Sequence, residues 1–181
     1  TKVLGITRKL FVREINEVCS LVRNNVHPDI PFAHKVADVV LPMRRVTEQE
    51  VAAAQAEIDA LTKKGDATRR RLWLQKVVGR YRAQDKESTL CVEVHALRIG
   101  DVAIVTNPFE LFLDYGVQMQ GRSKALQTFV FQLTNGSSGY LATERAVRGG
   151  GYSAVVASNR VGPEGGQMLV DRSVELINSL W

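Results

Sequence analysis

Cysteine is scarce in this sequence: only Cys19 and Cys91 occur among 181 residues. Each lies in a segment with the regular apolar spacing of a secondary-structure element. Two cysteines so far apart exclude a disulfide framework and a cysteine-based metal knuckle. We expect both side chains to be free thiols buried in the core.

Long apolar runs are missing as well. No window approaches the roughly 20 apolar residues that a membrane-spanning helix requires, and the first residues lack the basic head and apolar body of a signal peptide. The chain begins at Thr1 rather than at a methionine, close to an expected helix, which we interpret as a piece of a longer protein or a processed product. We expect the chain as given to be soluble, and its compartment stays open.

The signatures of three common enzyme classes are absent. There is no Gly-x-Ser-x-Gly elbow, no phosphate-binding loop and no dinucleotide fingerprint, so serine-triad, P-loop and Rossmann chemistry have no support. The three histidines, His27, His34 and His95, show no short metal-ligand spacing. His95 alternates with apolar residues, which is typical of a packed or hydrogen-bonded core histidine.

The sequence does contain enough apolar residues for one domain with a core. Hydrophobic residues make up 45% of the chain, and we interpret residues 1–181 as a single domain. The net charge is +5, and the densest basic cluster spans residues 63–82. Only two aromatic residues, Trp73 and Tyr81, interleave with it, so we interpret it as a solvated helix face and expect no nucleic-acid partner.

The helices are predicted from apolar spacing and capping signals. Apolar residues recur at intervals of three and four in residues 10–22, which indicates a helix. Thr47 and Glu50 have the spacing of a capping box before a helix over 51–64. Further helices are predicted over 67–84, 109–121 and 163–180. We interpret residues 47–84 as a helical hairpin that stands apart from the site of reaction.

The strands are predicted where the apolar period changes to two or becomes continuous. Residues 89–99 and 102–106, joined by Gly100-Asp101, indicate a β-hairpin. A buried strand is expected over 126–133, and a short edge strand over 35–41 because prolines enclose it. The fold class that follows is α/β, a mixed β-sheet with flanking helices plus the helical hairpin.

Three side chains are candidates for chemistry: Glu110, Tyr140 and Tyr152. Glu110 follows Asn107-Pro108 in apolar surroundings. It is either an acid in the first turn of a helix or a ligand or base with a cation as its partner. Tyr140 ends a polar loop and Tyr152 follows three glycines. Each tyrosine fits ordinary packing, but a phenolate can also bind a metal and a phenol can donate to an oxyanion.

Three motifs occur in a recognisable order: RIGDVAIVTNPFE at 98–110, GYLATE at 139–144 and GGY at 150–152. Together they resemble the C-terminal part of the catalytic domain of the neutral/alkaline, non-lysosomal ceramidase superfamily. The resemblance extends over residues 89–177 and is strongest to uncharacterised bacterial relatives in that superfamily.

The resemblance implies a zinc-dependent hydrolase that cleaves an N-acyl-sphingosine or another N-acyl amide. Position by position, it makes Glu110 and Tyr140 zinc ligands and Tyr152 a catalytic donor to the oxyanion, while the family's other two zinc ligands are histidines. A carboxylate and a phenolate suit zinc and leave a position open for water. The implied partners are a lipid or other N-acyl amide substrate and the upstream part of the same protein.

The chain also departs from the family pattern. Phe109 replaces a glycine, Ala142 a common proline, and Ser153 an acid that ceramidases often carry. None of the three histidines lies in a matching motif, so zinc belongs to the full-length parent and we expect this chain alone to be metal-poor and inactive. The alternative is a non-catalytic binding or structural domain that keeps the fold without a complete metal site.

Overall fold

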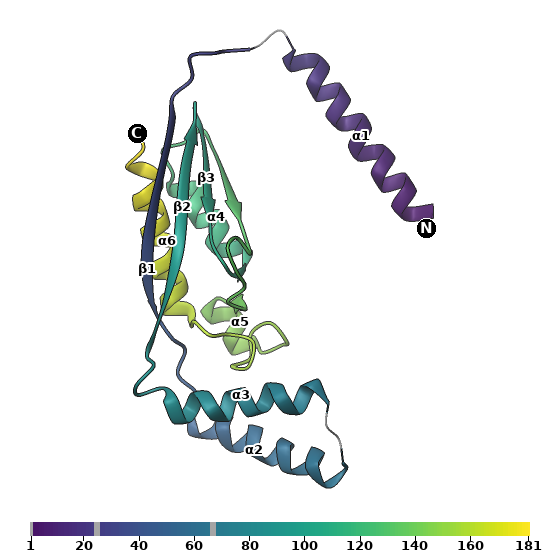
Figure 1. Cartoon of the computed structure of the whole chain (residues 1–181), viewed down its shortest axis with the longest axis vertical. Coiled ribbons are helices and arrows are strands. Elements are labelled where there is room, and N and C mark those ends of the chain that lie inside the picture. The colour runs from purple at the N-terminus through teal and green to yellow at the C-terminus, as the bar shows by residue number, and fades with distance from the viewer. Residues whose placement is uncertain (1, 24–25, 66–67) are drawn as a thin grey trace. The chain divides into compact units, whose positions relative to one another are not determined.

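The computed structural model of the chain describes residues 2–23, 26–65 and 68–181 (Figure 1). The contacts divide the chain into two compact units, Thr1–Pro31 and Phe32–Trp181. No helix in the described part of the chain is long and apolar enough to cross a membrane.

The first unit contains one helix, α1 (Lys2–Val22), which begins earlier than the predicted 10–22. The large apolar side chains over its residues 10–22 are exposed, among them Phe11, Ile15 and Leu21. Cys19 is free, as predicted, but it is exposed. The prediction of a buried thiol was wrong because apolar spacing shows that a helix has an apolar face and does not show that the face is covered.

The second unit is built on a four-stranded mixed sheet in the order β1-β2-β3-β5. The strands are β1 (Phe32–Pro42), β2 (Thr89–Ile99), β3 (Val102–Thr106) and β5 (Gln127–Phe131). The predicted hairpin of β2 and β3 is confirmed, with Gly100 at a φ of 62° in its turn. β3 pairs with β5 in parallel, and β1 is an edge strand as expected.

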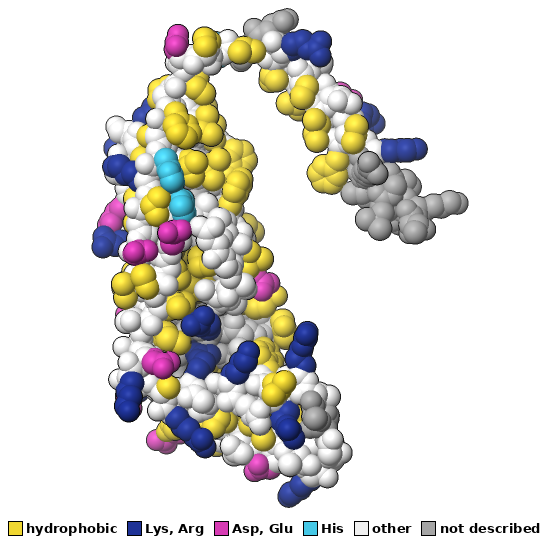
Figure 2. Space-filling model, viewed as in Figure 1, with side chains coloured by type: hydrophobic (Ala, Val, Ile, Leu, Met, Phe, Trp, Pro, Cys, Tyr) yellow, Lys and Arg dark blue, Asp and Glu magenta, His cyan; other side chains and the backbone are white. Residues whose placement is uncertain are grey.

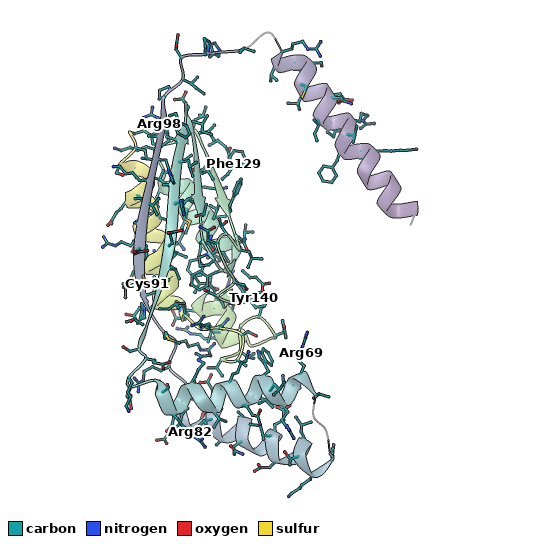
Figure 3. The ribbon with its side chains drawn as sticks, in the orientation of Figure 1. Arg69, Arg82, Cys91, Arg98, Phe129 and Tyr140 are labelled. Atoms are coloured by element: carbon teal, nitrogen blue, oxygen red, sulfur yellow. The ribbon has the colours of Figure 1, made fainter. Side chains whose placement is uncertain are left out.

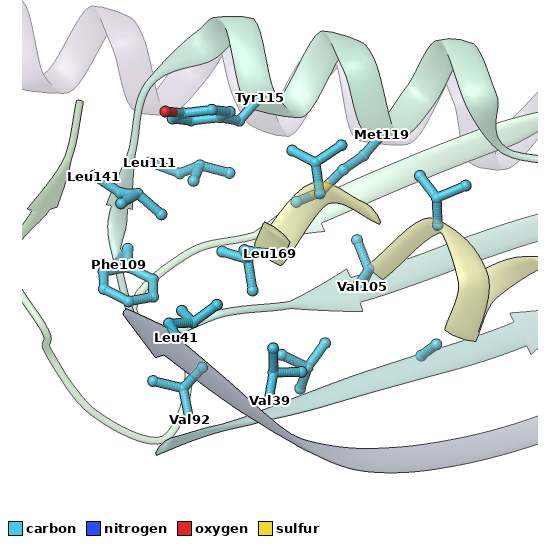
Figure 4. Close-up of a cluster of buried hydrophobic side chains, with 14 of the residues drawn as sticks. Val39, Leu41, Val92, Val105, Phe109, Leu111, Tyr115, Met119, Leu141 and Leu169 are labelled. Atoms are coloured by element: carbon cyan, nitrogen blue, oxygen red, sulfur yellow. The ribbon is translucent and has the colours of Figure 1, made fainter. Parts of the chain in front are cut away.

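Two helices cover one face of this sheet, α4 (Leu113–Arg122) and α6 (Pro163–Asn178). The core between the layers includes Val105, Met119 and Leu169, which are at most 1% exposed (Figure 4). Side chains on the other face are far more open, because strand residues alternate between the two faces. Phe129 is 47% exposed and Cys91 is a free, exposed thiol. The predictions of a buried strand here and of a buried Cys91 were therefore wrong.

The helical hairpin consists of α2 (Glu48–Lys63) and α3 (Arg69–Ala83). The predicted capping box is present, since the Thr47 side chain accepts a hydrogen bond from the Glu50 N–H and the Glu50 side chain accepts one from the Thr47 N–H. The hairpin has a small core of its own, to which Val156 from a later loop contributes: Val46, Ala54, Ile58, Leu74, Val77 and Val156. The hairpin is thus packed against the loops that follow the sheet.

A second, two-stranded parallel sheet lies at the end of the larger one. It pairs β4 (Glu110–Leu111) with β6 (Tyr140–Leu141), and the short helix α5 (Glu144–Gly149) follows. The helix predicted over 109–121 therefore begins later, at Leu113. Glu110 is a strand residue, so its interpretation as an acid in the first turn of a helix was wrong.

Candidate functional site

The backbone places Glu110 directly beside Tyr140, because the two are register partners in the parallel pair β4-β6. Three features fix this arrangement. The side-chain oxygen of buried Asn107 accepts a hydrogen bond from the Phe109 N–H at 3.0 Å, and Phe109 is fully buried, which contributes about 1.5–3 kcal/mol by burial of its ring. The Glu110 N–H then donates to the carbonyl of Gly139 at 3.0 Å.

Glu110 also affects the ionisation of the Tyr140 side chain. A hydrogen bond to the Glu110 carboxylate is the largest cause that raises the pKa of the Tyr140 phenol, followed by burial and by the negative charge of Glu110. The phenol is the donor and the carboxylate the acceptor, so the bond favours the neutral phenol. Figure 3 shows Tyr140 at the end of the sheet that faces the hairpin.

Tyr152 joins the pair from the loop after α5. Its ring meets that of Tyr140 edge to face, with centroids 5.9 Å apart and an angle of 79° between the rings. On its other side it stacks on Trp73 of α3 at 5.6 Å and 28°, and the Arg70 guanidinium lies 5.4 Å from the Trp73 ring centroid. Tyr152 is nevertheless 70% exposed, so its hydroxyl is available to a ligand.

Buried polar side chains tie the Tyr152 loop to β6. The amide of Asn159 donates to the carbonyls of Tyr140 at 3.0 Å and Ser153 at 2.9 Å, and its oxygen accepts from Arg44 at 2.7 Å. The Ser158 hydroxyl donates to the carbonyl of Tyr152. These hydrogen bonds hold the loop that carries Tyr152 against the strand that carries Tyr140.

Gly139 allows the close approach of these segments. Its φ is 79°, and a Cβ there would lie 2.7 Å from the carbonyl oxygen of Ser158. That same oxygen accepts the N–H of Tyr140 at 3.1 Å. Only glycine combines this backbone conformation with this contact.

The helix α3 lines the same cleft as Glu110, Tyr140 and Tyr152, so the hairpin is in contact with the candidate site. Arg80 donates to the carbonyl of Val156 at 2.7 Å and to that of Arg44 at 2.9 Å. Burial lowers the pKa of Arg80, and the positive charges of Arg44 and Arg160 lower it further. The guanidinium therefore joins the hairpin to the loops around Tyr152.

These elements enclose an open cleft of about 580 Å³, a volume typical of small-molecule sites. The three residues singled out from sequence, Glu110, Tyr140 and Tyr152, all line it. Sequence reasoning missed its opposite wall, which is formed by Trp73, Lys76, Val77 and Arg80 on one face of α3. Their spacing of three and four residues was visible in the sequence, but it did not show what that face covers.

The described residues do not complete a metal site. Nowhere in residues 2–23, 26–65 and 68–181 do three or more His, Cys, Asp or Glu side chains gather as a metal would require. Glu110 and Tyr140 offer two oxygen ligands from paired strand ends. His34 and His95 lie on paired strands of the larger sheet, where their ring nitrogens are 2.9 Å apart, and His95 also contacts Glu93.

Comparison with known proteins gives a similarity of fold. No family description and no curated protein sequence matches the chain. Two solved structures resemble it, one described as "Ceramidase complexed with C2" and the other as neutral ceramidase from Pseudomonas aeruginosa, with TM-scores of 0.45 and 0.44. Each is 17% identical to the chain and covers 51% of it, whereas the chain spans only 15% of either ceramidase. The predicted resemblance is thus confirmed as structural similarity, and similarity of this degree says nothing about chemistry.

Proposed function

We propose that the cleft is part of the active site of a zinc-dependent amide hydrolase similar to the neutral ceramidases, with an N-acyl-sphingosine or another N-acyl amide as substrate. One observation carries the proposal. A carboxylate and a phenol, those of Glu110 and Tyr140, stand on paired strand ends, and both residues line a cleft of ligand size.

Glu110 and Tyr140 would be two ligands of the zinc ion. The two residues are register partners on β4 and β6, so their side chains leave neighbouring positions of the backbone. A bound cation favours the phenolate, which reverses the effect of the Glu110 carboxylate on Tyr140. When bound, zinc would supply an acidified water as the nucleophile.

Tyr152 would serve as the hydrogen-bond donor to the oxyanion that forms on the amide carbonyl. Its exposed hydroxyl projects from a ring that is held between Tyr140 and Trp73. Trp73 would act as a positioning residue, since it contacts Tyr152 rather than the reacting atoms.

The remaining ligands would come from outside these 181 residues, as the incomplete ligand set in the described part of the chain requires. The upstream part of a longer protein would supply two histidines to the same cleft. The interaction with that upstream part is therefore necessary for activity.

The proposal is tested in the longer protein by zinc content and by hydrolysis of ceramide and simpler N-acyl amides. Glu110→Gln and Tyr140→Phe each remove one ligand, and we expect both zinc content and the rate to fall at least tenfold. Glu87→Gln and Tyr81→Phe are the matched controls, because Glu87 lines the cleft elsewhere and Tyr81 does not line it. Full zinc content and activity in both ligand variants would refute the proposal.

The second candidate is a non-catalytic binding domain that keeps the fold. It is favoured by the lack of a complete metal-ligand group in the residues that the structure describes. The same zinc measurement separates the two. A longer protein that binds no zinc and cleaves no N-acyl amide would support the binding domain.

A further inference from the structure

The cleft carries more positive than negative side chains. Three cationic residues line it, Lys76, Arg80 and Arg160, against two acidic residues, Glu87 and Glu110. Figure 2 shows dark blue Lys and Arg side chains gathered where the hairpin meets the rest of the second unit. The distribution of these charges depends on which of them are already paired.

Arg80 is already committed to the fold. It donates to two backbone carbonyls, those of Val156 and Arg44, which bring it no negative charge. Arg44 has its own acidic partner, Glu50, at 3.0 Å. Arg80 therefore adds positive charge to the cleft, and Glu50 offsets only part of it.

Lys76 and Arg160 are the cations of the cleft that are free to bind. Within the described ranges, neither side chain forms a hydrogen bond or an ion pair. Both are exposed. By contrast, Arg70 on the same helix as Lys76 makes two hydrogen bonds to Glu57, at 2.8 and 2.9 Å.

The backbone at Lys76 and at Arg160 is held in place by the fold. Lys76 lies one helical turn after Trp73 on α3 and so shares its side of the helix. The carbonyl of Arg160 accepts the Arg44 N–H at 2.9 Å, and Arg160 directly follows Asn159, which holds Tyr140. Their backbones are thus fixed relative to the cleft, and only the side chains have to be ordered by a ligand.

We infer that Lys76 and Arg160 form an oxyanion-binding subsite of the cleft and that the substrate is an amide bearing a carboxylate, such as an N-acyl amino acid. A carboxylate bound in the cleft that both cations line would relieve the repulsion between Arg160 and Arg80 and would form charge-assisted hydrogen bonds. This inference rests on the proposed function only for the amide. The subsite itself is tested by ligand binding and does not depend on hydrolysis.

Binding can be measured in the 181-residue chain by tryptophan fluorescence. Trp73 lines the cleft, and the only other tryptophan, Trp181, lies against Arg98 at 4.3 Å. A Trp181→Phe background makes Trp73 the sole reporter. In the unmodified chain, the indole N–H resonance of Trp73 in a nitrogen-15 spectrum gives the same information if that variant folds poorly.

The probes are N-hexanoylglycine and its methyl ester, which differ in the negative charge. We expect N-hexanoylglycine to bind about tenfold or more tightly than the ester, because the free energy of a hydrogen bond between charged groups corresponds to a ratio of that size in the dissociation constants. Its binding should weaken as salt is added. N-hexanoylaminomethylphosphonate and inorganic phosphate form a second arm. If these two bind more tightly than N-hexanoylglycine, the subsite recognises a phosphate and the assignment of a carboxylate is wrong.

Arg160→Gln and Lys76→Gln should each weaken N-hexanoylglycine about tenfold and leave the ester unchanged. The control is Arg82→Gln, which removes an exposed positive charge from α3 outside the cleft (Figure 3). Equal affinity for acid and ester, or an equal loss in Arg82→Gln, would overturn the subsite. Glu110→Gln should retain the preference for the acid, so a failure of the zinc proposal would leave this binding result intact.

Discussion

Glu110 and Tyr140 are register partners on parallel strands, and the carboxylate of Glu110 raises the pKa of the Tyr140 phenol. The relationship joins two motifs that are about thirty residues apart in the sequence. It brings the side chains into the cleft whose other wall is α3. Four predictions follow from this arrangement and its supports, each with a control in the same chain.

Glu110 should set the titration of Tyr140. In Glu110→Gln the pKa of Tyr140 should fall back toward its ordinary value near 10, because the carboxylate that favours the neutral phenol is gone. A pKa raised by folding stabilises the protein below the unfolded pKa, and this contribution is lost as pH rises through the folded pKa. Ultraviolet titration of tyrosinate in wild type and variant measures the shift.

Tyr115 is the internal control for this titration. Burial raises its pKa to about 12, with a smaller effect of Asp114, and its hydroxyl donates to the carbonyl of Ala142 at 3.1 Å. The titration step of Tyr115 should occur at the same pH in wild type and in Glu110→Gln. A variant in which every tyrosine titrates as before would contradict the effect of Glu110 on the Tyr140 pKa.

Gly139→Ala should destabilise the second unit more than Gly100→Ala. Both glycines have positive φ, 79° and 62°, but a new Cβ at Gly139 meets the Ser158 carbonyl at 2.7 Å and one at Gly100 meets nothing within 4 Å. We expect a free energy of unfolding about 1–3 kcal/mol lower at Gly139 than at the control. Urea unfolding of the two variants compares them, and equal losses would show that the contact is unimportant.

Trp73 and Tyr152 should be energetically coupled. Their stacked rings predict an interaction free energy of about 0.5–1.5 kcal/mol in a double-mutant cycle of Trp73→Ala and Tyr152→Ala. Trp73→Phe should keep part of it, because a ring remains. The pair of Tyr152 with Tyr81, which lies outside the cleft lining, serves as the control cycle and should give no coupling.

Asn159→Ala should be among the most damaging substitutions near the cleft. It removes two hydrogen bonds to carbonyls and one from Arg44, all at a buried position. We expect a loss of about 2–3 kcal/mol in the free energy of unfolding. Asn135→Ala is the comparison, because Asn135 is exposed and bonds at 2.9 Å to exposed Glu93; equal losses would mean that burial of the network is irrelevant.

Local signals in the sequence predicted local structure well. The capping box of Thr47 and Glu50 and the turn at Gly100 are both present, because each depends on residues within a few positions of one another. The strand at Glu110 was missed, because a two-residue strand exists only through its pairing with Tyr140. A helix was predicted there from the residues that form α4.

The candidate residues could be identified from the sequence, but their surroundings could not. Motif order singled out Glu110, Tyr140 and Tyr152, and the structure places all three in one cleft. The role of Trp73 depends on how the hairpin packs against a loop about eighty residues later. Exposure was misjudged at Cys91 for a similar reason, because alternation along a strand defines two faces without showing which one is covered.

The most direct test of the zinc proposal is the zinc content of two purified proteins, the 181-residue chain and the longer protein, each with and without Tyr140→Phe. We predict little zinc in the 181-residue chain, one zinc ion in the longer protein, and loss of that ion in its Tyr140→Phe variant. One zinc ion in the 181-residue chain that is lost on Glu110→Ala would show that the site is complete without the upstream part. Undiminished zinc in the Tyr140→Phe variant of the longer protein would contradict the assignment of Tyr140 as a ligand.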